Sequence, residues 1–239
     1  MTTTRTIWQL FDLTGRTALV TGARGHLGRS LAEALAEAGA RVVVSSRERD
    51  QAEEFAGCLG GAAAGQHFGV ALDQQEESSI TAAFTEVVAR SGRLDILVNN
   101  AHEPLGADWR TVTGEQFQQQ LANLTGYFLL ARLLRDHAVT VGHSASIVML
   151  GSMYGVVGSY PQAYEGICIA SPAPYHALKG GIVQLTRHLA VYWAGDGVRV
   201  NCLSPGPFPG PAAPPEMVER LKQRSPLGRM GRPEELKGA

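Results

Sequence analysis

The sequence TALVTGARGHLG at residues 17–28 places three glycines directly after a short apolar run. Residues 17–21 have the apolar, β-branched character of a buried strand, and residues 26–38 repeat apolar side chains along one face of a helix. The turn between these elements contains Gly22, Gly25 and Gly28. Glycine permits a tight bend and close approach of the backbone to a pyrophosphate, whose charge the helix N-terminus stabilises. The stretch therefore predicts a dinucleotide-binding turn.

The alternation of strand and helix continues along the chain. Further strands are predicted over residues 41–45, 67–71, 94–99, 145–150 and 198–203. Helices are predicted over residues 48–58, 76–90, 113–137 and 174–194. Because the strands are nearly all apolar, both faces of their sheet must be covered, which is typical of parallel sheets. We expect an α/β fold, a doubly wound parallel sheet with helices on both faces (a Rossmann fold), in a single dinucleotide-binding catalytic domain over residues 1–239.

Composition and charge exclude several classes of protein. With 44% hydrophobic residues and a net charge of -1, the chain is neither disordered nor a nucleic-acid binder, which requires a basic surplus. Its three cysteines are far apart, which indicates reduced thiols, and no histidine pair has metal-ligand spacing, so we expect no metal site. Residues 1–10 lack the apolar run of a signal peptide, and no stretch is long enough to span a bilayer. We expect a cytoplasmic protein without membrane or nucleic-acid partners.

The residues after the second predicted strand indicate which dinucleotide is bound. At this place a carboxylate accepts from the 2′-hydroxyl of NAD, whereas an arginine matches the 2′-phosphate of NADP. The chain has Ser46 and Arg47 there and no carboxylate before Glu48, and Arg24 in the glycine turn could reach the same phosphate. The alternative is that both arginines are merely solvated. We expect NADP(H) to be favoured over NAD(H).

Tyr175 and Lys179 form the chain's most specific catalytic pattern. They are four residues apart, so in a helix they share one face. Lysine occurs only three times in the chain, and Tyr175 is the only tyrosine followed by lysine at this spacing. A neighbouring cation favours the phenolate and lowers the tyrosine pKa, as general acid/base catalysis requires. The pair therefore predicts a proton-transfer site.

Together with the glycine turn, these residues resemble the single-domain branch of the short-chain dehydrogenase/reductase family. The resemblance runs from about Phe11 to the C-terminus and includes Asn99-Asn100-Ala101, Asn123, Ser152, Tyr175, Lys179, Asn201 and Pro205-Gly206. It implies that Tyr175 exchanges a proton with the substrate, while Lys179 lowers the Tyr175 pKa and holds the nicotinamide ribose. It implies further that Ser152 binds the substrate oxygen and that Asn123 holds a water in the proton relay.

The same resemblance extends the cofactor site beyond the glycine turn. Asp73 matches the residue that contacts adenine, and Asn99 matches the one beside the adenosine ribose. The expected cofactor-binding residues are Gly22, Arg24, Gly25, Gly28, Ser46, Arg47, Asp73, Asn99, Ala101, Tyr175, Lys179, Pro205 and Gly206.

The chain departs from the family pattern at several positions. His26 and His102 replace glycines, and Pro207 replaces the threonine that binds the carboxamide. Between Ser152 and Tyr175 lie 22 residues, more than in many members. We expect residues 154–174 to form a lobe over the substrate pocket, with Tyr164 and Glu165 as polar contacts for a hydroxylated substrate. The alternative is a surface loop without function.

These observations predict an NADP(H)-dependent oxidoreductase that interconverts a secondary alcohol and a ketone, with a sugar or polyol as the expected substrate. A 3-oxoacyl thioester reductase and a catalytically inactive NAD(P)-binding sensor or scaffold are the alternatives, and the intact Ser152, Tyr175 and Lys179 oppose the latter. By resemblance we expect a homo-oligomer, a dimer or a tetramer. We expect residues 207–239 to be a mobile substrate-side segment. Relatives continue past it into a seventh strand, so we expect weaker stability or assembly here.

Overall fold

The strands of the chain form a parallel sheet whose order reverses at its centre. The structure, a computed structural model, describes residues 4–239; residues 1–3, the start of the stretch in which we expect no signal peptide, lie outside the described residues. Within this range six strands lie in the order β3-β2-β1-β4-β5-β6. They are β1 (Thr17–Val20), β2 (Arg41–Ser46), β3 (Phe68–Ala71), β4 (Ile96–Asn99), β5 (Ala145–Leu150) and β6 (Val198–Leu203). The chain winds outward from β1 and then outward from β4 on the other side, which confirms the doubly wound sheet.

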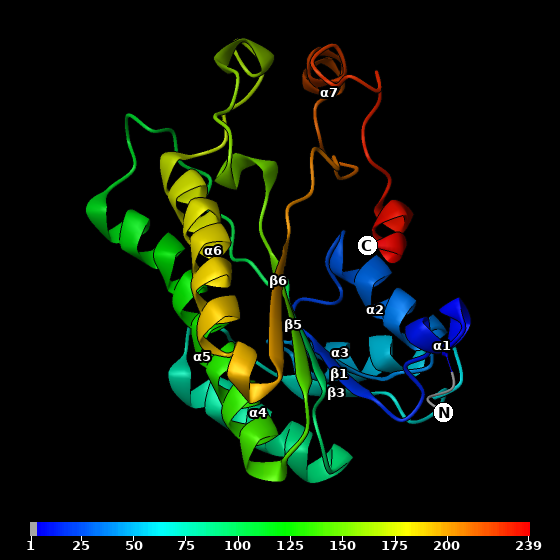
Figure 1. Ribbon diagram of the computed structural model, residues 1–239. Helices are drawn as coiled ribbons and strands as arrows, with labels where there is room; N and C mark the ends of the chain where they lie inside the picture. Colours follow the sequence, from blue (N-terminus) through cyan, green and yellow to red (C-terminus); the bar gives the residue numbers. More distant parts are fainter. Residues whose placement is uncertain (1–3) are drawn as a thin grey trace.

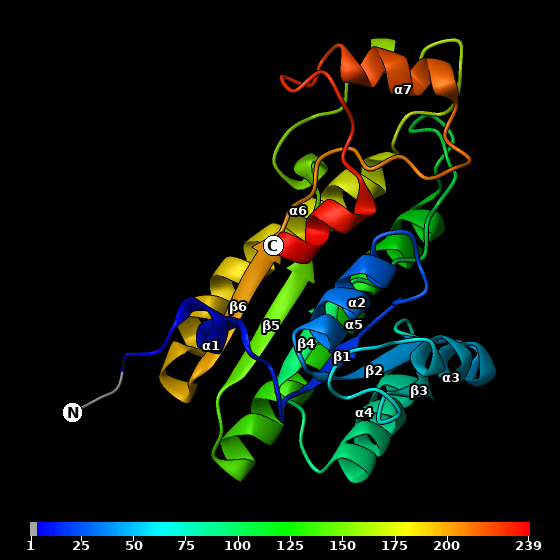
Figure 2. The same cartoon turned by 90° about the vertical axis from the view of Figure 1, so that its right-hand side faces the viewer.

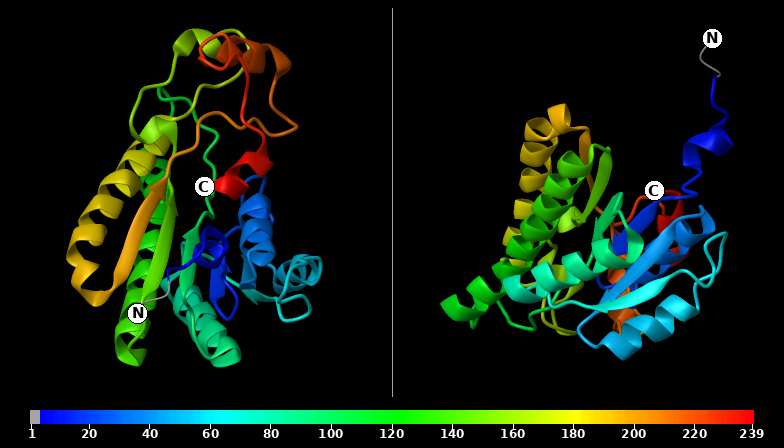
Figure 3. Two further views of the ribbon diagram at one scale, coloured as in Figure 1. Left: turned by 45° about the vertical axis from the view of Figure 1, so that its right-hand side comes forward. Right: turned by 90° about the horizontal axis from the view of Figure 1, so that it is seen from below.

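Helices cover both faces of this sheet (Figures 1 and 3). One face carries α2 (Gly28–Glu37) and α3 (Arg49–Gly57), and the other carries α4 (Glu77–Ser91), α5 (Gly114–Val141) and α6 (Ala173–Tyr192). Two short helices, α1 (Ile7–Phe11) and α7 (Pro215–Lys222), were not predicted, because each has too few residues for an apolar period to be recognised. The sheet and its five covering helices are the predicted Rossmann fold.

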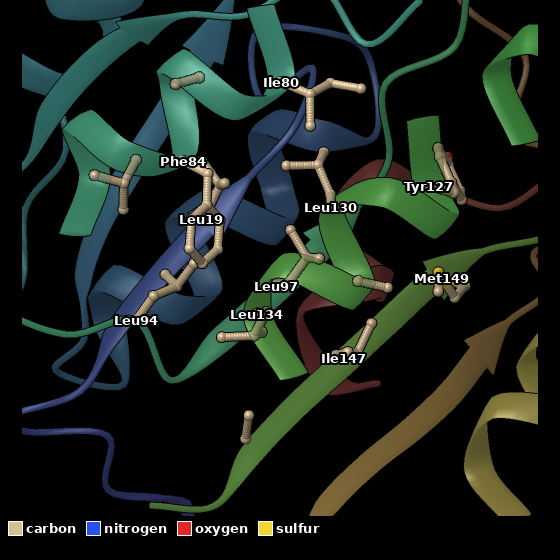
Figure 4. Close-up of a cluster of buried hydrophobic side chains, with 14 of the residues drawn as sticks. Leu19, Ile80, Phe84, Leu94, Leu97, Tyr127, Leu130, Leu134, Ile147 and Met149 are labelled. Atoms are coloured by element: carbon tan, nitrogen blue, oxygen red, sulfur yellow. The ribbon is translucent and has the colours of Figure 1, made fainter. Parts of the chain in front are cut away.

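The apolar runs of the strands supply two cores, one on each face. Successive side chains of a strand point to opposite faces, so Leu19 packs toward α4 and α5 while Val20 packs toward α2 and α3. Figure 4 shows the first core, in which strand residues meet two helices: Leu19, Leu97, Ile147, Ile80, Phe84, Leu130 and Leu134. Burial on both faces explains why these strands lack the alternation of a half-exposed strand.

Two segments lie above the carboxyl ends of β5 and β6 (Figure 2). They are the predicted lobe, residues 154–174, and the stretch that carries α7. Arg220 of α7 donates to the carbonyls of Gln162 and Glu165, at 2.9 and 2.8 Å. Ala163 and Tyr164 of the lobe pack with Leu221 and Met230. The lobe and the C-terminal segment therefore form one joined cover above the ends of β5 and β6; the mobility and the substrate-side role expected of residues 207–239 stay predictions.

An apolar groove lies next to one edge of the sheet. β6 is the strand at this edge, and the groove, of about 780 Å³, lies between α2 and the sheet. The 3₁₀ turn Pro233–Gly238 packs against α2, where Lys237 pairs with Glu33 and Glu37. In the described part of the chain, no helix combines the length and apolar character that crossing a bilayer needs.

Candidate active site

The glycines of the first turn allow α2 to start directly against the end of β1. A Cβ on Gly28 would lie 2.3 Å from the Gly22 carbonyl oxygen, and one on Gly22, whose φ is +60°, would lie 2.8 Å from the Cα of Ala101. Neither position accepts a side chain, so both glycines are required by the backbone packing. His26, by contrast, is exposed and borders the cleft, so the departure from the family pattern falls where a side chain has room.

The loop after β4 clamps this turn from the other side. The Asn100 amide donates to the carbonyls of Thr21 and Gly22, at 2.9 and 3.0 Å. The Thr21 hydroxyl accepts from the backbone N–H groups of Asn100 and Ala101, both at 2.9 Å. Sequence reasoning missed the roles of Thr21 and Asn100. The sequence signal that could have identified both residues is a polar side chain directly after each of the two central strands, β1 and β4.

The neighbouring Asn99 is the last residue of β4. Its side chain is fully buried and donates to the Tyr127 carbonyl at 2.9 Å, away from the cleft. Its place beside the adenosine ribose stays a prediction, and this side chain does not provide the contact. Asn100 and Ala101, which follow the strand, border the cleft.

A first cleft of about 400 Å³ opens above the glycine turn. The predicted residues that line it are Gly22, Arg24, Gly25, Gly28, Ser46, Arg47, Asp73 and Ala101. Arg47 is largely exposed at its rim and pairs with Glu103 at 3.2 Å. Arg24 lies on the same rim and donates to Gln51. The cleft thus joins a helix N-terminus, which attracts phosphate, to two exposed guanidinium groups.

A second cleft of about 180 Å³ continues from the first. The predicted residues that line it are Ser152, Tyr175, Lys179, Pro205 and Gly206. Ser152 follows β5, Pro205 and Gly206 follow β6, and the other two lie near the start of α6. Leu27, Asn100 and His102 line both clefts, so the two form one path from the glycine turn to Tyr175.

The environment of Tyr175 and Lys179 is mostly dry. Lys179 is 5% exposed, donates to the Leu150 carbonyl at 2.7 Å, and lies 5.6 Å from the centre of the Tyr175 ring. Burial lowers the pKa of Lys179 to about 8, so the ammonium is still mostly charged at pH 7. Burial raises the pKa of Tyr175, and a hydrogen bond with Ser152 opposes that rise. The net shift is upward, so the lowering of the Tyr175 pKa by Lys179 stays a prediction.

Asn123 is held by three hydrogen bonds within the protein. Its side-chain oxygen accepts from Gln74 at 2.8 Å and from the backbone N–H of Glu103 at 2.9 Å, and its amide donates to the Gln120 carbonyl at 2.9 Å. These bonds connect α5 to the loop after β4. The role of Asn123 in holding a relay water stays a prediction.

The two polar residues singled out in the lobe have different surroundings. Tyr164 is buried, and its hydroxyl pairs with that of Tyr154 at 2.5 Å. Glu165 is exposed, and its backbone carbonyl accepts from Arg220. Their contacts with a hydroxylated substrate stay a prediction. Among residues 4–239 no group of histidine, cysteine, aspartate or glutamate side chains is arranged to hold a metal ion.

Comparison with known proteins assigns this arrangement to a family. A family model described as enoyl-(acyl carrier protein) reductase matches residues 22–239. The galactitol 2-dehydrogenase (L-tagatose-forming) of Cereibacter sphaeroides is 35% identical over 243 residues, covering 96% of this chain and 88% of that protein. The chain is a short-chain dehydrogenase/reductase.

Other members of the short-chain dehydrogenase/reductase family match it at similar length. A rhamnolipid-biosynthesis 3-oxoacyl-[acyl-carrier-protein] reductase of Pseudomonas aeruginosa is 34% identical, with 95% of this chain and 88% of that protein covered. The crystal structure of a gluconate 5-dehydrogenase from Burkholderia cenocepacia, in complex with NADP and tartrate, has a TM-score of 0.85. It is 29% identical, and the match covers 98% of this chain and 89% of that one.

Membership of the short-chain dehydrogenase/reductase family makes the chain an NAD(P)-binding oxidoreductase. The first cleft fits the diphosphate of such a dinucleotide, because the glycine turn and the N-terminus of α2 form a backbone cradle along it. The path past His102 leads from this cradle to Tyr175 and Lys179. The nicotinamide end would lie along the same path, beside Tyr175 and Lys179.

Proposed function

We propose that this enzyme interconverts a secondary alcohol and a ketone with NADP(H), and that its substrate is a sugar or polyol. The convergence of Ser152, Tyr175 and Lys179 at the end of the joined clefts carries the proposal. When bound, the nicotinamide supplies or accepts the hydride, so the chain itself needs a proton donor and groups that hold the reacting oxygen.

Each of the three residues has a separate task in this proposal. The Tyr175 hydroxyl gives a proton to the ketone oxygen in reduction and takes one from the alcohol in oxidation. Ser152, which lowers the pKa of Tyr175, donates to the same substrate oxygen and so stabilises the charge that develops there. Lys179, anchored on the Leu150 carbonyl, supplies a fixed positive charge behind the tyrosine and a donor for the nicotinamide ribose.

Arg47, Arg24 and Ser46 support a preference for NADP(H). All three line the first cleft. The carboxylate that pairs with Arg47 is Glu103, and it lies on the loop after β4. It is therefore not the carboxylate after the second strand that would accept from the 2′-hydroxyl of NAD. An arginine matches the 2′-phosphate in charge and in donor geometry.

Arg47→Asp tests this preference. We expect the Kd for NADPH to rise at least tenfold while the Kd for NADH changes little, since only NADPH carries the phosphate. Fluorescence titration measures both constants, and Arg187→Asp on the exposed side of α6 controls for the loss of surface charge. An unchanged ratio of the two constants would refute the role of Arg47.

The substrate class rests on the relatives and is tested by a panel. A galactitol dehydrogenase and a gluconate dehydrogenase support polyols, whereas the 3-oxoacyl reductase supports the alternative. NADPH consumption is measured with ketoses and with a 3-oxoacyl thioester, and NADP reduction with polyols. We expect the highest kcat/KM with a polyol or ketose. Turnover of the thioester alone would contradict the proposal.

We also propose that the enzyme works as a dimer or tetramer, as its resemblance to the family implies. Size-exclusion chromatography with light scattering measures the assembly. A monomer at micromolar concentration would oppose this part of the proposal.

A further inference from the structure

His102 lies at the junction of the two clefts and has no role in the proposed proton transfer. It lines both clefts, and its ring meets the Tyr175 ring edge to face, with centroids 5.3 Å apart at 71°. The family pattern has glycine at this position, so the imidazole is a polar group that the pattern lacks. Its protonation pattern therefore decides what the junction can bind.

Gln120 fixes that pattern. Its side-chain nitrogen lies 3.2 Å from the Glu103 carbonyl oxygen and 2.8 Å from Nε2 of His102. A carbonyl only accepts, so the amide group that faces it must be the NH₂, although Gln120 Oε1 then has no partner among the described residues. The second N–H of this group points to His102 Nε2. That nitrogen must therefore present its lone pair, and the ring proton is on Nδ1.

The surroundings keep this tautomer neutral and in place. Gln120 is 2% exposed, and its side-chain amide donates to the Glu103 carbonyl, so the amide is anchored. Burial and the nearby Lys179 charge lower the pKa of His102 to about 4. The imidazole is therefore neutral in the physiological range, with one N–H that donates and one nitrogen already used.

We propose that His102 Nδ1–H is a binding donor for a hydroxyl oxygen that lies where the two clefts join. Within residues 4–239, no protein group forms a hydrogen bond with Nδ1, nor is Nδ1 among the fully buried polar atoms that lack a partner. It therefore opens to the cleft. A neutral N–H suits a hydroxyl, because it demands no counter-charge from its partner.

Two sources can supply this hydroxyl, and both belong to the function proposed above. One is the ribose on the nicotinamide side of the cofactor, which must pass His102 on its way from the glycine turn to Tyr175. The other is a second hydroxyl of a polyol substrate, next to the carbon that reacts. In either case His102 recognises a hydroxyl next to the reacting centre, not the reacting oxygen itself.

The test compares three substitutions at this position. His102→Asn keeps an N–H donor, His102→Leu fills a similar space without one, and His102→Gly removes the side chain altogether. The measurements are the Kd for NADPH by fluorescence titration, and the KM for a polyol and for a secondary alcohol with a single hydroxyl. The Kd does not depend on turnover, so it reports on His102 even if the proposed activity is absent.

If the ribose is the acceptor, we expect His102→Leu and His102→Gly to raise the Kd roughly 3- to 10-fold, the effect of one lost neutral hydrogen bond, and His102→Asn to restore much of it. If the substrate is the acceptor, the Kd stays constant and only the polyol KM rises by that factor. Equal constants for all variants and the wild type would overturn the proposal. So would equal losses in His102→Asn and His102→Leu, which would indicate a role in packing.

Discussion

At the scale of single residues, two opposing effects set the acidity of Tyr175. Burial disfavours the charged phenolate and raises its pKa, while the hydrogen bond from Ser152 favours the phenolate and lowers it. A raised pKa keeps the hydroxyl protonated at neutral pH, which suits its role as a proton donor in ketone reduction. In alcohol oxidation the same group must first be deprotonated, so the rate of oxidation should increase with pH.

Ser152→Ala removes the effect that lowers this pKa. We expect the pH at which alcohol oxidation becomes half-maximal to move upward, and kcat at neutral pH to fall on the order of 100-fold, because a donor to the reacting oxygen is also lost. The pH profile of kcat measures both effects. Ser144→Ala, at the opposite end of β5, is the control. A Ser152→Ala profile that superimposes on the wild type would show that Ser152 does not act on Tyr175.

At the scale of elements, the substrate side is formed by the lobe and α7 together. The two N–H···O bonds of Arg220 join elements far apart in the sequence, and the apolar contacts of Tyr164 with Leu221 support them. Arg220→Ala should loosen this cover and raise the KM for the polyol by roughly 3- to 10-fold with little change in kcat. Lys222→Ala is the control, because it removes a cation from the same helix that pairs with Glu219 within α7 and not with the lobe. If steady-state kinetics gave the same KM for the two variants, the joined cover would have no part in substrate binding.

The sequence predicts the elements better than the contacts between them. Strands buried on both faces are recognisable as apolar runs, and the glycine turn and the Tyr175–Lys179 spacing are local patterns. The choice between Asn99 and Asn100 depends on how β4 ends in space. The meeting of His102 and Gln120 depends on how the loop after β4 folds onto α5. The raised pKa of Tyr175 reflects burial, which a residue pattern does not contain.

At the scale of the whole molecule, cofactor binding should stabilise the fold. A ligand that binds only the native state at 100 times its Kd adds about 2.7 kcal/mol to the free energy of unfolding. For a domain of this size, that raises Tm by roughly 5–10 °C. We expect NADPH to produce this shift and NADH at the same concentration to produce a smaller one, because Arg47 and Arg24, which line the first cleft, are proposed to bind the 2′-phosphate. Thermal melts measure both shifts, and equal shifts would contradict the NADP(H) preference.

The central claim is that Tyr175 transfers the proton, and the kcat of Tyr175→Phe tests it most directly. The substitution keeps the ring, and with it the contacts to His102 and Lys179, while it removes only the hydroxyl. Tyr192→Phe, exposed at the end of the same helix, is the matched control. We predict that Tyr175→Phe lowers kcat by about 10²- to 10⁴-fold with a much smaller change in the Kd for NADPH, while Tyr192→Phe behaves as wild type. A Tyr175→Phe enzyme that turns over its best substrate at the wild-type rate would contradict the claim.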